Sequence, residues 1–306
     1  MRLLSLTKGL TTKGLTQAKI QNDTFNADCG RLGKVMVSSL LLSLIGSSVQ
    51  AASLITDTDY LEYELPKTVQ DQCNEQKNCP EIEIKYLKTN QDWINKTVNK
   101  RINNLVVNSQ PSDKPVSKAT SQQAAKIAID DFVTSQLAEV PKGVSWGYSL
   151  MVKPDYLGHI RLGQAEDFEL FEIDTYVFTG GAHGMPLSEY LIFDTRTQTQ
   201  IKLDDILRDG KQSKFKTLAY TAYKAWIPSV AKDVSDYEKN WPFTLSDNVT
   251  FSDQGLNIRY QHYDIAPYAY GMPVLTIPYS QLGDIIKPKF IPSTLPAKPK
   301  KPINAK

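Results

Sequence analysis

This 306-residue sequence predicts an α+β fold with a mainly antiparallel β-sheet meander and about three packed helices. Apolar residues recur at every second position in many short segments, which is the period of a strand. They recur at helical spacing in a few longer segments. Strands and helices do not alternate regularly, as the units of a parallel sheet would. We therefore expect strands that pair mainly in antiparallel fashion.

Residues 1–51 have the features of a signal peptide with a long n-region. An apolar or small-residue run, Val35–Val49, follows Arg31 and Lys34 and ends at Ala51 in a pattern that suits signal peptidase. The run is shorter than the roughly 20 residues that a membrane-spanning helix needs. We expect export to the periplasm or the exterior, with cleavage near Ala51. The segment would hold the chain at a membrane only if it were retained.

Two cysteines, Cys73 and Cys79, remain in the chain after that cleavage. An even pair in an oxidising compartment predicts a disulfide. A zinc site needs about four ligands, and none of the three histidines is near these cysteines in the sequence. The sequence also contains no phosphate-binding or dinucleotide-binding glycine motif. We predict no metal and no cofactor.

Residues 52–140 are predicted to form an N-terminal α+β region. Alternating residues predict strands at Tyr60–Leu65 and Glu81–Leu87, on either side of the cysteine loop. A helix follows Asn90, and a second helix follows Thr120, which can cap it.

Residues 141–286 are predicted to form a β-rich region. A strand beginning near Val144 ends at a turn, Pro154-Asp155, and another begins at Gly158. The segment 168–205 then reads as strand, glycine-rich bend, strand, turn and helix start.

The remainder of this region predicts a helix, a hairpin and a last strand. Helical spacing recurs over Lys211–Val230, and the helix is predicted to end near Pro228. The hairpin turns at Asp253-Gln254-Gly255. The last strand contains Pro273 and Pro278, which favour a position at the edge of a sheet.

Charge divides the chain into an acidic body and basic ends. Residues 287–306 contain six lysines, five prolines and no acidic residue, and they are predicted to be a disordered tail. Residues 52–286 contain 31 acidic and 23 basic residues, a formal charge of −8. This composition does not fit a nucleic-acid binder, whose footprint is basic. It fits simple solubility or the attraction of a cationic partner.

Five residues in two segments are candidate ligand-binding residues: His183 in the bend, and Tyr263, Asp264, Tyr268 and Tyr270 in the segment YDIAPYAYG. Aromatic rings with a polar group suit both a recognition surface and a packed loop corner, and both interpretations stay open. A histidine can act as a base or a ligand near neutral pH. No GxSxG or HExxH motif accompanies this one, so we assign no catalytic residue.

Several segments resemble the RsiV-like domain family. They are the loop TGGAHG, the following FDTRTQTQIKLDDIL, the distant YDIAPYAYGMPVLTIPYSQL and the N-terminal EIEIKYLKTNQDWINKTVNKRINNLV. The family includes the extracytoplasmic part of a lysozyme-sensing anti-sigma factor and a region of a peptidoglycan deacetylase outside its catalytic domain. Many members have no known function. The resemblance implies binding without catalysis.

We therefore expect an exported envelope protein, not an enzyme, that binds a cell-wall-associated ligand. Lysozyme and cell-wall glycan are the partners that the resemblance suggests. The alternative is a hydrolase or deacetylase acting on peptidoglycan or another polysaccharide. It would use His183 or carboxylates, of which Asp174, Asp194, Asp204 and Asp205 are the nearest candidates.

Overall fold

The computed structural model describes residues 54–76, 79–110, 115–116, 118, 121–139, 147–164 and 166–294. The predicted signal segment, Thr120, Trp146 and residues 295–306 lie outside these ranges.

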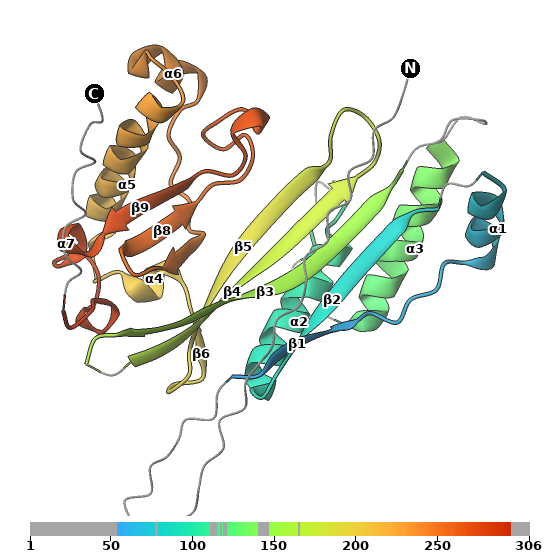
Figure 1. The fold of residues 1–306 in the computed structure, drawn as a ribbon, viewed down its shortest axis with the longest axis horizontal. Coiled ribbons are helices and arrows are strands. Elements are labelled where there is room, and N and C mark those ends of the chain that lie inside the picture. Colours follow the sequence, from blue (N-terminus) through green and yellow to red (C-terminus); the bar gives the residue numbers. More distant parts are fainter. Residues whose placement is uncertain are drawn as a thin grey trace, which may run out of the picture. The chain divides into compact units, whose positions relative to one another are not determined.

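Two sheets organise the described residues (Figure 1). The larger sheet has the order β1-β2-β3-β4-β5-β6, and all neighbours are antiparallel except β2 and β3. The smaller sheet, β7-β8-β9, is antiparallel throughout. The bounds are β1 Thr56–Tyr60, β2 Glu81–Thr89, β3 Ser149–Leu162, β4 Glu166–Phe178, β5 Met185–Asp194, β6 Thr199–Ile201, β7 Val249–Phe251, β8 Gly255–Arg259 and β9 Val274–Pro278. The predicted α+β fold with a mainly antiparallel sheet is confirmed.

The described residues contain seven α-helices and three short 3₁₀ helices. The α-helices are α1 Lys67–Gln76, α2 Asp92–Val107, α3 Gln122–Glu139, α4 Leu203–Ile206, α5 Gln212–Trp226, α6 Val234–Asn240 and α7 Tyr279–Leu282. The 3₁₀ helices are η1 Ile227–Ser229, η2 Tyr268–Tyr270 and η3 Pro288–Phe290. The three long helices α2, α3 and α5 are those that helical spacing predicts.

Strand β3 contradicts the predicted turn at Pro154-Asp155, because it runs unbroken to Leu162. Its pairing with β2 ends at Val152, so β3 has no neighbour on that side from Lys153 onward. An unpaired edge tolerates a proline, which has no backbone N–H to donate. Strand β3 does contain one irregularity in its pairing with β4, a bulge between Tyr156 and Gly158.

Helix α1 stands where the sequence analysis placed only a loop, and the first strand lies earlier than Tyr60–Leu65. Its described buried side chains are Val69 and Cys73, which are four residues apart. Two buried residues are too few to give a periodic signal. The predicted disulfide between Cys73 and Cys79 is present, with an S–S distance of 2.03 Å.

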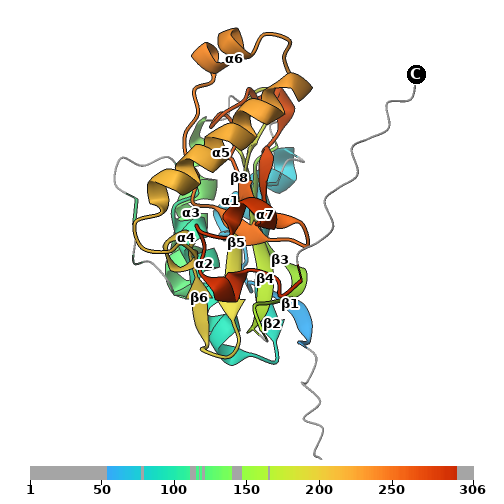
Figure 2. The same ribbon diagram turned by 90° about the vertical axis from the view of Figure 1, so that its left-hand side faces the viewer.

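The two faces of strand β4 belong to two different hydrophobic cores. Phe171 and Ile173 point to the face covered by α2 and α3, with Ile94, Ile102 and Phe132 in the same core. Phe168 and Leu170, which precede them in the strand, point to the opposite face. There the small sheet packs with α4, α5 and α7, and α5 lies along this sheet in contact with β9 (Figures 1 and 2).

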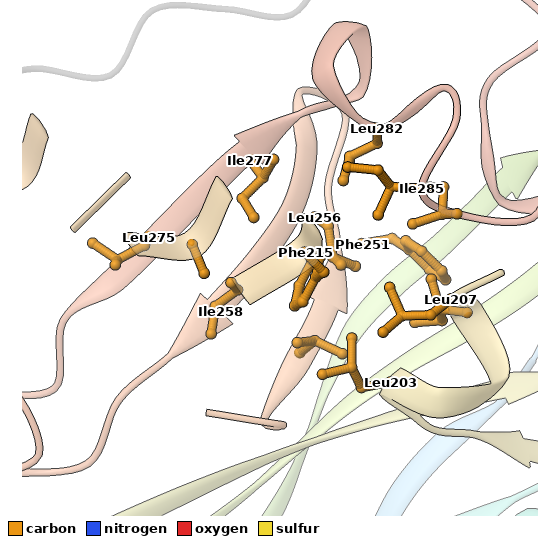
Figure 3. Close-up of a cluster of buried hydrophobic side chains, with 14 of the residues drawn as sticks. Leu203, Leu207, Phe215, Phe251, Leu256, Ile258, Leu275, Ile277, Leu282 and Ile285 are labelled. Carbon is orange, nitrogen blue, oxygen red and sulfur yellow. The ribbon is translucent and has the colours of Figure 1, made fainter. Parts of the chain in front are cut away.

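Figure 3 shows the second core, in which Phe215 of α5 points toward Leu256 and Ile258 of β8. The predicted boundary between residues 140 and 141 falls between two strands of the larger sheet. Strand β2 on one side of that boundary pairs with β3 on the other.

Two side-chain amides cover the open edge of β5. Strand β6 pairs only with Ile192–Asp194, which leaves the preceding part of this edge without a neighbouring strand. Gln261 fills the gap at Ser188, accepting from its N–H at 3.1 Å and donating to its carbonyl at 2.7 Å. Asn248 accepts from the N–H of Tyr190 at 2.8 Å and donates to the Ser188 carbonyl at 2.7 Å. We call this set of four hydrogen bonds the amide clamp.

A largely buried ion pair lies beside the clamp, with side chains that are 16% and 12% exposed. Arg259 of β8 lies 2.9 Å from Glu172 of β4 and donates to the hydroxyl of Tyr190 at 2.6 Å. Its guanidinium also lies 4.5 Å from the centre of the Tyr190 ring. Ser188 donates from its hydroxyl to Glu172. Burial raises the pKa of Glu172, while the bonds to Ser188 and Arg259 act in the opposite direction.

The predicted tail begins too early at Lys287. Phe290 is fully buried against Phe168 and Phe251, with ring centroids 5.5 Å away in each case. Nearby, Gly163 donates from its N–H to the carbonyl of Ile291 at 2.9 Å. The composition of residues 287–306, rich in proline and lysine, predicts a tail and gives no sign that Phe290 packs in the core. Residues 295–306 lie outside the described residues, and their disorder stays a prediction.

We expect Phe290→Ala to lower the free energy of unfolding by about 3–5 kcal/mol, because it removes a fully buried ring from a packed core. Truncation after Thr294 should leave the stability unchanged. Denaturation in guanidinium chloride measures both variants. A truncation that destabilises as much as Phe290→Ala would show that the residues beyond Thr294 also pack on the core.

Candidate ligand-binding site

A groove with a cavity of about 670 Å³ lies between the last turns of α2 and the ends of strands β4 and β5. Leu105 and Val177 contribute apolar lining, as do Met185 and Leu187. The last two side chains are 47% and 37% exposed. Strand β4 turns Thr175 and Val177 toward the helices because Phe171 and Ile173 share that face.

The charged and amide groups at this groove are largely paired with one another. Arg101 donates from Nε to Glu189 at 2.7 Å and from a terminal nitrogen to Asn104 at 2.7 Å. Asn104 and Asn108 donate to the carbonyl of Val116. No carboxylate is among the described residues that line the groove. The site is therefore close to neutral, with apolar and amide character.

Two buried polar atoms of the lining have no hydrogen-bond partner among the described residues: Oγ1 of Thr175 and Nδ1 of His262. Thr175 is only 8% exposed. An unsatisfied buried polar group costs about 1–3 kcal/mol, so such groups are rare in native structures. Their occurrence in one groove marks a place where a ligand could complete the hydrogen bonding.

His262 of the groove lining belongs to a stack of three rings. Tyr268 lies 3.7 Å from His183 and 4.3 Å from His262 between ring centroids, with interplanar angles of 16° and 24°. Two rings so close to a third cannot share one face, so the tyrosine is sandwiched between the imidazoles. Its hydroxyl donates to the carbonyl of Gly184 at 3.0 Å. The stack thereby joins the β4–β5 bend to the segment after β8.

The predicted site residues fall into two groups. His183, Tyr263 and Tyr268 come together, with the Tyr263 hydroxyl 3.3 Å from Nε2 of His183. Asp264 instead accepts from the N–H of Gln261 at 2.7 Å and holds a turn. Tyr270 points elsewhere and donates to the carbonyl of Val230 at 3.1 Å.

The nitrogens of His183 are both engaged within the loop. Nδ1 lies 3.0 Å from the carbonyl of Gly184, which can only accept, so this nitrogen carries the proton. Nε2 then accepts from Tyr263. The ring has a clear local role in holding the bend.

The carboxylates considered for catalysis do not converge on the groove. Asp194 is fully buried and accepts from the N–H groups of Arg196 and Thr197. Asp205 accepts from the N–H of Lys202 at the start of α4, as the predicted helix start requires. Asp174 and Asp204 line two other cavities, of about 450 and 430 Å³.

Thr175, Arg101, Gln261 and His262 line the groove but are not among the residues that the sequence predicts for the site. His262 directly precedes the tyrosine-rich segment, so its position was the one available signal. Thr175 reads as an ordinary strand residue, and the lack of a partner for its hydroxyl becomes visible only in three dimensions.

Burial lowers the pKa of the His262 imidazole below its ordinary value of about 6.5. A hydrogen bond to the Tyr268 backbone opposes this shift. Burial of His262 therefore favours the neutral form of its ring.

Within the described part of the chain, no group of three or more histidine, cysteine, aspartate or glutamate side chains could hold a metal ion. None of the helices in these ranges combines the length and the hydropathy that crossing a bilayer requires.

One family model matches part of the chain. Residues 204–280 match the model of a family described as "Protein of unknown function (DUF3298)". A DUF3298 family protein from Pseudomonas aeruginosa PAO1 is similar in structure, with a TM-score of 0.55 and 24% identity over 79% of this chain and 96% of that chain. A member of the family from Bacteroides fragilis NCTC 9343 gives 0.51 and 17%, over 77% and 94%. No curated protein matches the chain.

At these identities the likeness to the two structures concerns the fold. The matched segment runs from α4 to Ser280. It includes Asn248 and Gln261 of the amide clamp, as well as His262. The predicted resemblance to the RsiV-like family is not confirmed by these comparisons.

We expect wild-type stability to fall as the pH drops below about 6.5, because the folded state binds fewer protons at His262 than the unfolded state does. The contribution is present above the unfolded pKa and is lost as the pH falls through the folded pKa. His262→Phe keeps a ring against Tyr268 and should flatten the profile between pH 7 and pH 5. Urea denaturation across this range measures it, and parallel profiles for the two proteins would contradict the assignment.

Proposed function

We propose that this chain is a binding protein of the cell envelope whose ligand occupies the groove between α2 and the β4–β5 hairpin. The observation that carries the proposal is the unpartnered hydroxyl of Thr175, buried in the lining of a cavity large enough for a small ligand. The signal-peptide features of residues 1–51 support the envelope location. The Cys73–Cys79 disulfide also supports it, since such bonds persist in oxidising compartments.

Binding fits the groove better than hydrolysis does. Glycoside hydrolysis generally requires two carboxylates on opposite sides of the bond to be cleaved. The described lining of the groove offers none, and His183 uses both nitrogens in the bend. The ligand class that we propose is cell-wall-associated, as the sequence resemblance implies.

Replacing Thr175 with valine should separate binding from stability. Valine has nearly the same shape, so the fold should keep or gain stability when an unsatisfied hydroxyl is removed. Binding of soluble disaccharide–peptide fragments of peptidoglycan should weaken by about 0.5–1.5 kcal/mol, the usual value of a hydrogen bond. Isothermal titration calorimetry measures the affinity.

Thr250→Val is the matched control for this experiment. Thr250 is also buried with an unpartnered hydroxyl, but it lies in β7 outside the groove lining. It should therefore leave binding unchanged. Equal effects of the two variants would contradict the site. Shortened or deacetylated fragments appearing during the titrations would contradict binding without catalysis.

The most specific partner that we propose is lysozyme or a related muramidase. The formal charge of −8 on residues 52–286 favours association with a cationic protein. Tyr263 and Tyr270, each 46% exposed, offer aromatic surface to such a partner.

If lysozyme binds through this charge, raising the salt concentration should reduce the association rate much more than it raises the dissociation rate. Surface plasmon resonance measures both rates at about 20 mM salt, where charges are weakly screened, and at about 200 mM salt, where they are strongly screened. The absence of a complex at low salt would remove lysozyme as the partner. The groove and its small ligand would then remain to be tested by the fragment titrations.

A further inference from the structure

A cavity of about 450 Å³ uses the opposite face of strand β4 from the groove. Side chains alternate along a strand, so Asp174 and Tyr176 point away from the face to which Thr175 and Val177 turn. Met151 of β3 is paired with Tyr176 and lies on the same side of the sheet. We call this the sheet-face cavity. Its volume lies within the range of about 300–1,000 Å³ that small-molecule sites occupy.

Apolar groups form a large part of the lining of the sheet-face cavity. Met151 and Tyr176 come from the larger sheet, and Met272 comes from the segment before β9. All three residues are half-buried, so each keeps some surface for contact with a ligand. Methionine side chains are flexible and polarisable and adapt to ligands of different shape. The lining can therefore hold the hydrocarbon part of a small ligand.

The charged groups of the lining leave one negative charge without compensation. The described lining contains five charged residues, four of which have an ion-pair partner. The pairs are Glu83 with Lys85 at 2.7 Å, Lys153 with Asp155 at 3.2 Å, and Glu172 with Arg259 at 2.9 Å. Asp174 is the fifth, and its carboxylate has no ion pair or hydrogen bond among the described residues. The cavity is thus complementary to a single positive charge.

Lys153 does not neutralise Asp174, although the two residues are directly paired between β3 and β4. Its ammonium instead lies 3.2 Å from Asp155, which is two residues away on the same face of β3. One lysine therefore stands between two carboxylates. A ligand cation at Asp174 would complete the charge balance on this face of the sheet.

A lone carboxylate suits an organic cation better than a metal ion. Calcium takes about six to eight oxygen ligands, and magnesium requires about six in octahedral geometry. No group of three or more metal-ligating side chains of the histidine, cysteine, aspartate or glutamate type occurs in the part of the chain that the structure describes. An ammonium group needs only one carboxylate to balance its charge, and an attached alkyl chain can contact Met151 and Met272.

We infer that the sheet-face cavity binds an organic monocation, whose ammonium group pairs with the carboxylate of Asp174 and whose hydrocarbon part lies against Met151 and Met272. This site goes beyond the proposed function, because Asp174 and the groove residue Thr175 lie on opposite faces of β4. The fragment titrations at the groove and the test of this cavity can therefore fail independently.

Hexylammonium and its neutral counterpart hexanol test the inference on the full wild-type chain. In an NMR titration the methyl resonances of Met151 and Met272 should shift with hexylammonium, and hexanol should bind about tenfold more weakly because it lacks the charge. The methyl resonance of Met185, which lines the groove, should stay in place. Equal affinities for the two compounds, or a shift of Met185 alone, would overturn the inference.

Asp174→Asn tests the contact with the carboxylate. Asparagine has nearly the same shape, so hexylammonium binding should weaken by about tenfold while hexanol binding stays unchanged. Asp204→Asn is the matched control, since it removes an exposed carboxylate that lines a different cavity, and it should change neither affinity. An equal loss of hexylammonium binding in both variants would show a response to net charge alone and would overturn the contact.

An alkylammonium group occurs both in small amines and in the lysine side chains of proteins. A pentapeptide with blocked ends and one central lysine distinguishes these sources in the same titration. Shifts of Met151 and Met272 as large as those with hexylammonium would support the inference with a lysine side chain as the ligand. Shifts with hexylammonium but not with the peptide would support it with a small amine.

Discussion

The amide clamp on strand β5 is the interaction on which the rest of this structure depends. A strand edge without a neighbour presents backbone groups that need partners, and proteins usually cover such edges or disrupt them. Here Gln261 and Asn248 satisfy Ser188 and Tyr190 from outside the larger sheet. Because both amides belong to the chain around β7 and β8, the same bonds attach that region to the larger sheet.

The site follows from this attachment. Gln261 precedes His262, so fixing the amide against β5 also places the imidazole beside the groove and against Tyr268. The ring stack then reaches back to His183 in the β4–β5 bend. The ion pair between Arg259 and Glu172 is a second link between the two sheets, since it joins β8 to β4. A largely buried ion pair offsets its desolvation only when its remaining polar atoms are also hydrogen-bonded. Here Arg259 also donates to the Tyr190 hydroxyl, and Glu172 also accepts from the Ser188 hydroxyl.

The sequence predicted the long helices and the strands with clear alternation, because each carries its own periodic signal. It failed where long-range pairing decides the outcome. Pro154 lies inside β3 because the pairing with β2 ends at Val152, so its missing N–H leaves no bond to β2 unmade. Phe290 packs in the core although the residues around it are rich in proline and lysine. His183, Tyr263 and Tyr268 meet as a cluster, whereas Asp264 and Tyr270 serve local bonds. Thr175 could not be predicted, since an unpartnered hydroxyl has no sequence signature.

Hydrogen exchange at the backbone amides of Ser188 and Tyr190 tests the central role of the clamp most directly. In wild type both amides should be protected like that of Ile192, which lies where β5 has a strand partner. Asn248→Ala should expose Tyr190 and Gln261→Ala should expose Ser188, with protection lost by about tenfold or more for about 1.4 kcal/mol of local stability. Asn257→Ala, which removes only an exposed contact with Thr276, should change neither amide. Fast exchange of both amides in wild type, or unchanged protection in the two clamp variants, would contradict the account.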